Sequence, residues 1–384
     1  MVDKASLQVA TFSRLADIGQ ELWDACAGQG NPFVSYAFLS ALEDSGSVGA
    51  GTGWYPHYLG LREEGREISA VLPSYAKIHS YGEYVFDQEW ARAFEQAGGR
   101  YYPKLQVAVP FSPVPGPRLL ARAPKDASEF AAALEAVTKA SSCSSAHITF
   151  CTDAEWKHLG QAGWLQRLGI QFHWENRGYD NFDDFLEDLS SRKRKAIRRE
   201  RREAQTGLTF RTLHGTEITS ALWAKFYEFY LSTVERKWGN NYLTDTFFPL
   251  LGQRLGDKVV LMLAERNGKP IAGALNLRGE GILHGRNWGC VEDVPFLHFE
   301  LCYYQAIEYA ITHGLKRVEA GAQGEHKIQR GYLPQPTYSA HFIAHPGLRA
   351  AVERFLEGER RDILATIQEL TQEGPYKAES ERCA

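Results

Sequence analysis

The stretch GRNWGCVEDVPFLHFELCYYQAIEYAITHGLKRVEAGAQGEHKIQRGYLPQPTYSAH, residues 285–341, carries the signals that decide the predicted fold of this chain. It begins at the end of a predicted strand and continues into an apolar segment, 296–312, whose length suits a helix of about four turns. His313 and Gly314 end that helix, because glycine readily adopts the left-handed cap conformation. A short buried strand is expected next, at 315–318.

The loop after that strand, EAGAQGEHK at 319–327, concentrates acid, amide, imidazole and amine groups in nine residues. Reactive side chains in α/β folds gather at the carboxyl ends of strands. We therefore predict that the chemistry of the protein is centred on this loop.

Length and composition indicate two globular domains. A chain of 384 residues exceeds one ordinary core and suits two domains of roughly 150 to 200 residues. An apolar fraction of 44% and an aromatic fraction of 12% are enough to build two cores, which excludes wholesale disorder. The net charge of −4 and the sequence pI of about 6.3 give no global basic field that would demand a nucleic acid.

Cysteine and histidine spacing argues against a disulfide scaffold or a metal site. The six cysteines include no CxxC pair, and the 12 histidines show neither HExxH nor HxH spacing. Residues 1–10 lack the features of a secretion signal, and no window approaches 18 consecutive apolar residues. We expect a soluble, cytoplasmic protein with reduced thiols, no metal and no membrane span.

The first half reads as alternating helices and strands. Helices are expected at 34–43, 90–97, 126–139 and 153–162. Strands are expected at 57–62, 68–75, 84–87, 104–109, 147–151 and 170–175.

The second half has a similar order of elements. Residues 180–204 are helical in composition, and 192–202 hold eight basic residues among eleven. Further elements are a strand at 208–213, a helix at 216–237, a meander at 259–265, 271–277 and 282–288, a strand at 337–344 and a helix at 347–370. Asn267-Gly268 at the first turn of the meander is a strong hairpin signal.

This repeated order predicts an α+β protein built from two similar domains in tandem. We place the boundary near Arg177-Gly178, which gives an N-terminal domain of 1–177 and a C-terminal domain of 178–384. No sequence repeat accompanies the repeated order of elements.

Several segments resemble a known bacterial family. They are Asn31-Pro32-Phe33, HSYGEYVFD (79–87), YYPKLQ (101–106), RKRKAIRRER (192–201), LHFELCYYQAIEYA (297–310) and VEAGAQGEHKIQRGYLP (318–334). The chain resembles the peptidoglycan-biosynthesis-like N-acyltransferases, which are similar to the Fem-type aminoacyltransferases with tandem GNAT folds. The resemblance covers nearly the whole chain and implies two GNAT-like domains, each a mixed, mostly antiparallel sheet flanked by helices.

The resemblance also implies a reaction and a place for it. A GNAT-type enzyme passes an acyl group to a deprotonated amine, and the acyl donor lies where the fourth and fifth strands of the sheet splay. Those strands would be 282–288 and 315–318, which places Arg286, Trp288 and Glu319 beside the gap. The general base would come from Glu319, Glu325, His326 or His298.

Other side chains would bind substrate. Lys327 would hold a phosphate or the oxyanion, since Fem-type enzymes have a lysine in a similar place, and Gln323 and Arg330 would line the same loop. An exposed turn with its own ion pairs is the alternative for this loop. From the N-terminal half, Glu83 would orient an amine, and Lys104 and Arg118 would hold anionic groups, unless all three form a polar rim. A buried, hydrogen-bonded His298 is as consistent with the pattern as a catalytic one.

The donor is the main open choice. Coenzyme A enzymes of this superfamily hold the pyrophosphate on a glycine-rich loop at a helix N-terminus. The corresponding segment here, Cys290 to Pro295, has two carboxylates and a proline instead. This departure disfavours acyl-CoA and favours an aminoacyl ester such as aminoacyl-tRNA.

The basic segment 192–202 offers a contact for tRNA, with Arg198, Arg199, Arg201 and Arg202 as the phosphate-binding residues. A solvated helix face with ion pairs to neighbouring acids explains the same run. We predict an N-acyltransferase that forms an amide on a small or peptide-like amine. The alternatives are an acetyl-CoA-dependent N-acetyltransferase and an inactive binding module for cell-wall fragments or nucleic acid.

Overall fold

The computed structural model describes residues 7–123, 127–236, 239–322 and 324–377, and it divides into two compact units. Unit 1 comprises Met1–Gly169 and Pro336–Ala365, and unit 2 comprises Ile170–Gln335 and Thr366–Ala384. This division differs from the single boundary predicted at 177/178. The strands β9 (Leu165–Glu175) and β15 (Leu333–Ile343) each begin in one unit and end in the other.

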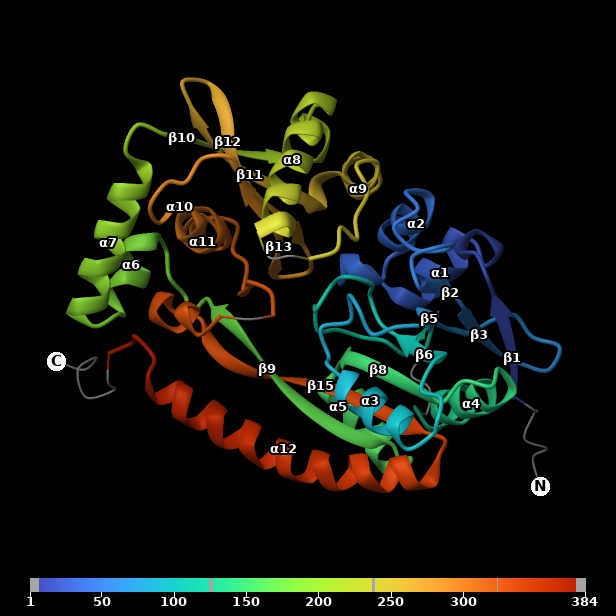
Figure 1. Ribbon diagram of the computed structural model, residues 1–384. Helices are drawn as coiled ribbons and strands as arrows, with labels where there is room; N and C mark the ends of the chain where they lie inside the picture. Colours follow the sequence, from blue (N-terminus) through green and yellow to red (C-terminus); the bar gives the residue numbers. More distant parts are fainter. Residues whose placement is uncertain (1–6, 124–126, 237–238, 323, 378–384) are drawn as a thin grey trace. The chain divides into compact units, whose positions relative to one another are not determined.

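The sheet of unit 2 is an antiparallel meander (Figure 1) that is extended by a parallel strand and then by an antiparallel one. Its order is β10 (Thr209–His214), β11 (Val259–Arg266), β12 (Lys269–Arg278), β13 (Ile282–Cys290), β14 (Arg317–Glu319) and the second part of β9. Strands β10 to β13 pair antiparallel, β13 pairs parallel with β14, and β14 pairs antiparallel with β9. At the predicted β11–β12 turn, Asn267 and Gly268 have φ values of 52° and 73°, as a tight hairpin requires.

The helices of unit 2 differ from the predicted ones in two places. They are α6 (Phe182–Glu187), α7 (Ser191–Gln205), α8 (Ser220–Arg236), α9 (Phe247–Leu255), α10 (Leu297–Phe299) and α11 (Gln305–Thr312). The predicted helix 180–204 is broken between α6 and α7, and α9, whose sequence contains Pro249 and Gly252, was not predicted. Residues Glu300–Tyr304 form a π-helical turn that joins α10 to α11.

Unit 1 contains two sheets. The first consists of β1 (Leu7–Phe12), β3 (Tyr58–Glu63), β4 (Ala70–Leu72) and β7 (Leu120–Ala121). The second has the order β15, β8 (Ser145–Cys151), β6 (Lys104–Val107), β5 (Ser74–Lys77) and β2 (Trp54–Pro56). Its helices are α1 (Gln20–Ala27), α2 (Tyr36–Asp44), α3 (Gln88–Gln96), α4 (Ala127–Ala140), α5 (Asp153–Gln161) and most of α12 (Pro346–Gln372). The predicted strand at 84–87 is wrong, because these residues form an irregular segment.

Both units repeat one arrangement of strands. In unit 2 an antiparallel pair, β12–β13, is followed by the parallel pair β13–β14 and the antiparallel pair β14–β9. In unit 1 the antiparallel pair β5–β6 is followed by the parallel pair β6–β8 and the antiparallel pair β8–β15. The repeated order of elements in the sequence thus corresponds to a repeated sheet topology.

The core of unit 2 holds the parallel pair of strands in place. Leu283 on β13, Val318 on β14 and Ile307 on α11 are fully buried in one apolar cluster. Burial of each such side chain stabilises the fold by about 1.5 to 3 kcal/mol. The paired segments of β13 and β14 are therefore held by a packed core.

Candidate functional site

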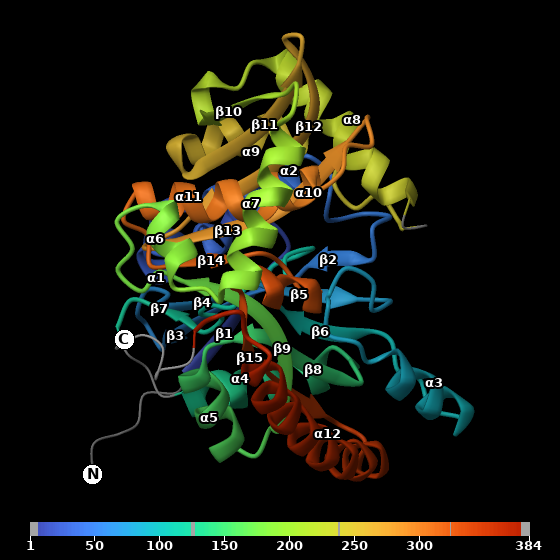
Figure 2. The ribbon, with the colours of Figure 1, turned by 90° about the vertical axis from the view of Figure 1, so that its left-hand side faces the viewer.

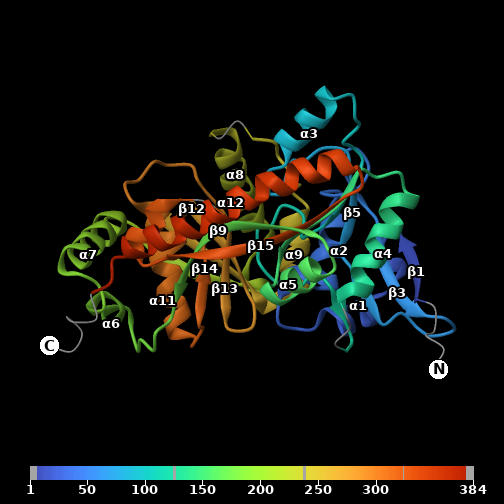
Figure 3. The same ribbon diagram turned by 90° about the horizontal axis from the view of Figure 1, so that it is seen from below.

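The parallel strands β13 and β14 separate soon after they meet. They pair at three positions only, the last being His284 with Glu319, whereas β13 continues to Cys290. Figure 3 shows β14 between β13 and β9. At the point of separation β13 has a β-bulge against β12, with Arg286 as the extra residue between Gly285 and Asn287. Bulges are frequent next to active sites, where they redirect side chains.

Three titratable side chains lie in one row across this point. His284, Glu319 and His173 occupy paired positions on β13, β14 and β9, so their side chains share a face of the sheet. His284 Nδ1 lies 2.9 Å from Glu319 Oε2, and the side chains of both residues are at most 5% exposed. A buried carboxylate hydrogen-bonded to an imidazole is the arrangement that orients a histidine base.

The charges in this row keep its carboxylate ionised. Burial by itself raises the pKa of Glu319, but the charge and hydrogen bond of His284, together with His173 and Arg317, outweigh it and lower the pKa to about 2. A carboxylate with so low a pKa stays ionised and is a poor base near neutral pH. Burial lowers the pKa of His173 to about 4, so this imidazole is neutral at pH 7.

Helix α8 covers the separated end of β13. Thr233 Oγ1 donates to the Trp288 carbonyl oxygen at 2.7 Å, and Ser232 Oγ donates to the Cys290 carbonyl oxygen at 2.9 Å. Arg236 also donates to the Cys290 carbonyl oxygen, at 2.7 Å. Side chains of α8 thus donate hydrogen bonds to backbone carbonyl oxygens of β13 beyond the point where β14 ends.

Three predicted site residues meet in an aromatic cluster. The rings of Trp288 and His298 are 5.1 Å apart, and His298 lies 5.3 Å from Tyr303. Tyr303 Oη is 2.9 Å from His326 Nε2, which connects α10 and the π-helical turn to the loop after β14. A π-helical turn is often found at functional positions. Phe296, before α10, has φ 61°, an uncommon conformation for a bulky residue.

The other predicted residues of the loop have different environments. Glu325 and His326 are exposed, whereas Lys327 is 2% exposed and donates from Nζ to the Gly321 carbonyl oxygen at 3.0 Å. Arg330 is buried, pairs with Glu200 at 2.9 Å and lies over the ring of Phe299. Gln323 lies outside the described residues.

Three residues of unit 1, Glu83, Lys104 and Arg118, were predicted to contact substrate, and the structure brings the first two together. Lys104 Nζ donates to Glu83 Oε2 at 2.7 Å, and both side chains are buried. Arg118 is also fully buried, but its side chain donates to the backbone carbonyls of Thr149, Val114, Gly116 and Pro117. These bonds stabilise the chain around the end of β8, so the substrate role predicted for Arg118 is replaced by a structural one.

The basic helix α7 divides into a buried and an exposed part, and it runs beside α10 and the π-helical turn (Figure 2). Arg201 is largely buried and pairs with Glu300 at 3.0 Å and with Glu308 at 2.7 Å, so it is not available to a nucleic acid. Arg198 pairs with Asp183 at 3.1 Å. Arg199 and Arg202 are exposed, as predicted for phosphate-binding residues, and they share this surface with Arg192 and Lys195.

No group of three or more His, Cys, Asp or Glu side chains that could hold a metal ion is found within residues 7–123, 127–236, 239–322 and 324–377. Over the same residues, no helix combines the length and apolar character needed to cross a bilayer.

The row at the strand separation contains two residues that sequence analysis missed, His284 and His173. The one available signal was a histidine inside each predicted buried strand, where an unpaired polar group is costly. Their meeting with Glu319 depends on strand pairing between segments far apart in the chain, which a single sequence does not display.

Comparisons with known proteins identify the family and the fold. A family model for FemAB-like proteins, described as peptidoglycan biosynthesis/recognition, matches residues 14–378. A search of curated proteins finds no match.

Among solved structures, FemX matches with a TM-score of 0.53 and 12% identity over 90% of this chain and 100% of FemX. L-PGS from Bacillus licheniformis matches with a TM-score of 0.52 and 10% identity over 85% of this chain and 98% of that one. A conserved protein of unknown function from Bacteroides thetaiotaomicron has a TM-score of 0.51 and 8% identity, covering 87% and 99%. These likenesses concern the fold, and the predicted α+β class is confirmed.

Proposed function

We propose, since the chain belongs to the FemAB-like family, that it is an N-acyltransferase whose reaction takes place where β13 and β14 separate. The observation that carries the proposal is the His284–Glu319 pair, buried at the last paired position of the two strands and next to the bulge at Arg286. The acceptor is an amine on a small or peptide-like molecule, such as a peptidoglycan fragment.

The chemical steps follow from what amide formation requires. The acceptor nitrogen attacks the carbonyl carbon of the donor ester, and His284 accepts the proton that this nitrogen loses. Glu319 accepts a hydrogen bond from His284 and stabilises the imidazolium that forms. The tetrahedral intermediate then collapses, the carbon–oxygen bond of the ester breaks, and the proton passes to the leaving oxygen.

Substrate would be held by groups beside the pair. The aromatic cluster of Trp288, His298 and His326 provides apolar faces with polar edges, which suits a peptide-like chain. Lys327 is a buried ammonium on the loop after β14 and supplies positive charge for a phosphate or for the oxyanion. These roles for the loop residues are part of the proposal.

We further propose that the donor is an aminoacyl ester, with aminoacyl-tRNA as the first candidate, and that the reaction is cytoplasmic. Two observations support an ester over acyl-CoA. Exposed Glu292 and Asp293 precede α10, where a pyrophosphate would need backbone N–H groups and no carboxylates. Hydroxyls of α8 already occupy the Trp288 and Cys290 carbonyls on the separated end of β13.

The proposal is tested by offering two donors to the purified protein. tRNA charged with radiolabelled amino acids and radiolabelled acetyl-CoA are each incubated with muropeptides and small amines, and label in the acceptor is measured. We expect transfer from charged tRNA. His284→Ala should lower the rate of transfer by about 10² to 10⁴-fold, which is the range for a general base. Glu319→Gln should also lower this rate.

The control is His158→Ala, which removes an exposed imidazole from α5 in unit 1. Thermal melting of each variant shows whether the fold is kept. A folded His284→Ala protein with the wild-type rate would disprove the assignment of the base. If label is transferred from acetyl-CoA and not from charged tRNA, the donor is a thioester, and the proposed ester donor is wrong.

A further inference from the structure

Residues 78–87 of unit 1 show an inverted distribution of polar and apolar side chains. We name this irregular segment between β5 and α3 the strap. Its large apolar side chains point outward, with Ile78 at 53%, Tyr81 at 55% and Phe86 at 59% exposure. Its two carboxylates point inward, with Glu83 at 4% and Asp87 at 2%. A segment that buries charge and exposes apolar groups must be held by the groups beneath it.

Beneath the strap, two lysines lie directly opposite each other on neighbouring strands. Lys77 on β5 and Lys104 on β6 are cross-strand partners, and both are fully buried. Like charges in such a position destabilise a sheet. Buried cations side by side are tolerated when an anion lies between them, so the pair forms a site for an anion.

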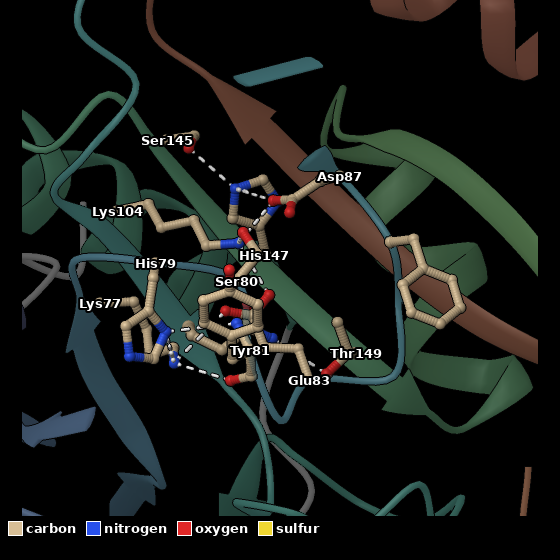
Figure 4. Close-up of polar contacts among 12 residues, drawn as sticks. Lys77, His79, Ser80, Tyr81, Glu83, Asp87, Lys104, Ser145, His147 and Thr149 are labelled. Carbon is tan, nitrogen blue, oxygen red and sulfur yellow. Dashed lines mark hydrogen bonds and ion pairs between the residues drawn. The ribbon is translucent and has the colours of Figure 1, made fainter. Parts of the chain in front are cut away.

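In this structure the strap itself supplies that anion (Figure 4). Glu83 Oε2 accepts from Lys104 at 2.7 Å, and Glu83 Oε1 lies 3.7 Å from Lys77 Nζ. The carboxylate of Glu83 therefore bridges the two ammonium groups. Asp87 is a second contact of Lys104, at 2.5 Å, and Ser80 Oγ accepts from the same Nζ at 2.9 Å.

The fit of the carboxylates is incomplete. Within the described residues, Glu83 Oε1 and Asp87 Oδ1 are buried and accept no hydrogen bond. Burial raises the pKa of Glu83 to about 7 and lowers the pKa of Lys77 to about 7, in each case against the pull of the opposite charges. Buried polar atoms without partners are destabilising, which weakens the hold of the strap.

We propose that Lys77 and Lys104 form a binding site for a phosphate or carboxylate group of a ligand, and that the strap covers this site through Glu83 as an internal substitute for that group. Lysine binds such oxyanions as a compact point charge. When the ligand enters, Glu83 leaves the lysines and the strap moves outward with Tyr81, Tyr84 and Phe86. The site belongs to unit 1 and does not depend on acyl transfer in unit 2.

The test measures anion binding and strap opening separately. Pyrophosphate and malonate are titrated calorimetrically into wild type, Glu83→Gln and Lys77→Met. Glu83→Gln removes the competing charge and should tighten binding at least about tenfold, since a hydrogen bond to a charged group contributes more than the energy of one decade. Lys77→Met should weaken it at least as much. Lys139→Met, an exposed lysine on α4, is the matched control and should bind like wild type.

Strap opening is followed by chymotrypsin, which cuts after the exposed Tyr81, Tyr84 and Phe86. Pyrophosphate should speed cleavage within 78–87, as detected by mass spectrometry. Gly82→Ala opens the strap without a change of charge, because a Cβ at this position, with φ 80°, would lie 2.7 Å from the ring of Phe111. It should raise both anion affinity and cleavage.

Binding of either anion with the expected order of the variants supports the site, and the preferred anion identifies a phosphate or a carboxylate ligand. Equal affinity of Lys77→Met and wild type would overturn the proposal. So would a failure of both Glu83→Gln and Gly82→Ala, each folded by circular dichroism, to bind more tightly than wild type. Acyl transfer need not be measured, so these results are independent of the proposed reaction.

Discussion

At the scale of single residues, Glu319 is the side chain whose role changed most between sequence and structure. It was predicted beside the strand gap as one of four candidate bases, and it does lie at the point of separation. It contacts His284 and has a low pKa, and in the proposed reaction it orients the imidazole of His284. A buried carboxylate held this way also contributes to stability, and that contribution depends on pH.

We predict that Glu319→Gln destabilises the protein in a pH-dependent manner. The folded pKa of about 2 lies below the ordinary value of 4.5. The contribution of Glu319 is therefore fully present above pH 4.5 and is lost as the pH falls toward 2. The difference in unfolding free energy between wild type and variant should reach at most about 3 kcal/mol above pH 5 and shrink in acid.

Urea denaturation of both proteins between pH 3 and pH 8 measures this difference. Glu325→Gln is the control, since Glu325 is exposed and its loss should change stability by less than about 0.5 kcal/mol. A Glu319→Gln protein whose deficit is the same at every pH would show that the pKa of Glu319 is the same in the folded and the unfolded protein.

Residues of the site were predictable to the extent that they share one stretch of chain. Trp288, His298 and His326 all belong to the segment 285–341 and do meet. His284 and His173 were missed because their partner is reached through sheet pairing across the fold. The reverse failure was Arg201, which looked like surface charge in the sequence and is neutralised by Glu300 from another helix.

At the scale of elements, α8 packs directly against the separated end of β13. A Cβ added to Gly289 on β13 would clash with the carbonyl oxygen of Phe229 on α8. The hydroxyls of Ser232 and Thr233 reach the β13 carbonyls only because the helix lies this near. Glycine at 289 is therefore a packing requirement for the helix that closes this edge of the strand.

We predict that Gly289→Ala lowers the free energy of unfolding by about 1 to 3 kcal/mol or more, the usual cost of overpacking in a core. Gly358→Ala is the matched control, because this glycine lies within α12 and a Cβ there would meet no atom within 4 Å. Alanine is the better helix former, so the control should gain about 0.5 to 1 kcal/mol. Thermal and urea unfolding measure both. Equal stability of Gly289→Ala and wild type would mean that α8 moves away at little cost.

Elements were predicted well where local chemistry decides them and poorly where tertiary contacts do. The Asn267-Gly268 hairpin rests on turn conformation alone and was correct. The strand expected at 84–87 contains aromatic and β-branched residues, but Asp87 turns inward to Lys104 and Tyr84 has φ 61°. The ion pairs that Glu83 and Asp87 form with Lys77 and Lys104 outweigh the local preference for a strand.

At the scale of the whole molecule, family and fold were recoverable from sequence. The FemAB-like family and the α+β fold are confirmed, and they span nearly the whole chain. The division into units was not recoverable, since Pro336–Ala365 returns to the first unit. That return depends on strand pairing of β15 with β8, which no local pattern in the sequence indicates.

The distribution of charge over the molecule decides whether a polyanion donor is plausible. The chain carries a net charge of −4, yet Arg192, Lys195, Arg199 and Arg202 are spaced by three and four residues along α7. Such spacing places them on one face of a helix, and all four are exposed. Arg199 has one carboxylate nearby, Glu203 at 3.7 Å. We name these four residues the basic face.

We predict that the basic face binds the phosphates of tRNA. Replacing its four residues by alanine should weaken tRNA binding and flatten its salt dependence, because each lost phosphate contact reduces the slope of log K against log salt by about 0.7 to 0.9. Filter binding between 50 and 300 mM salt measures the slope.

The matched control replaces four exposed cations of unit 1 by alanine and changes the net charge equally. These cations are Arg66, Arg92, Lys139 and Lys157. If both variants flatten the slope alike, the effect is one of total charge, and α7 is not the contact. A change confined to the basic-face variant assigns the polyanion to this helix, since net charge is the same in the two proteins.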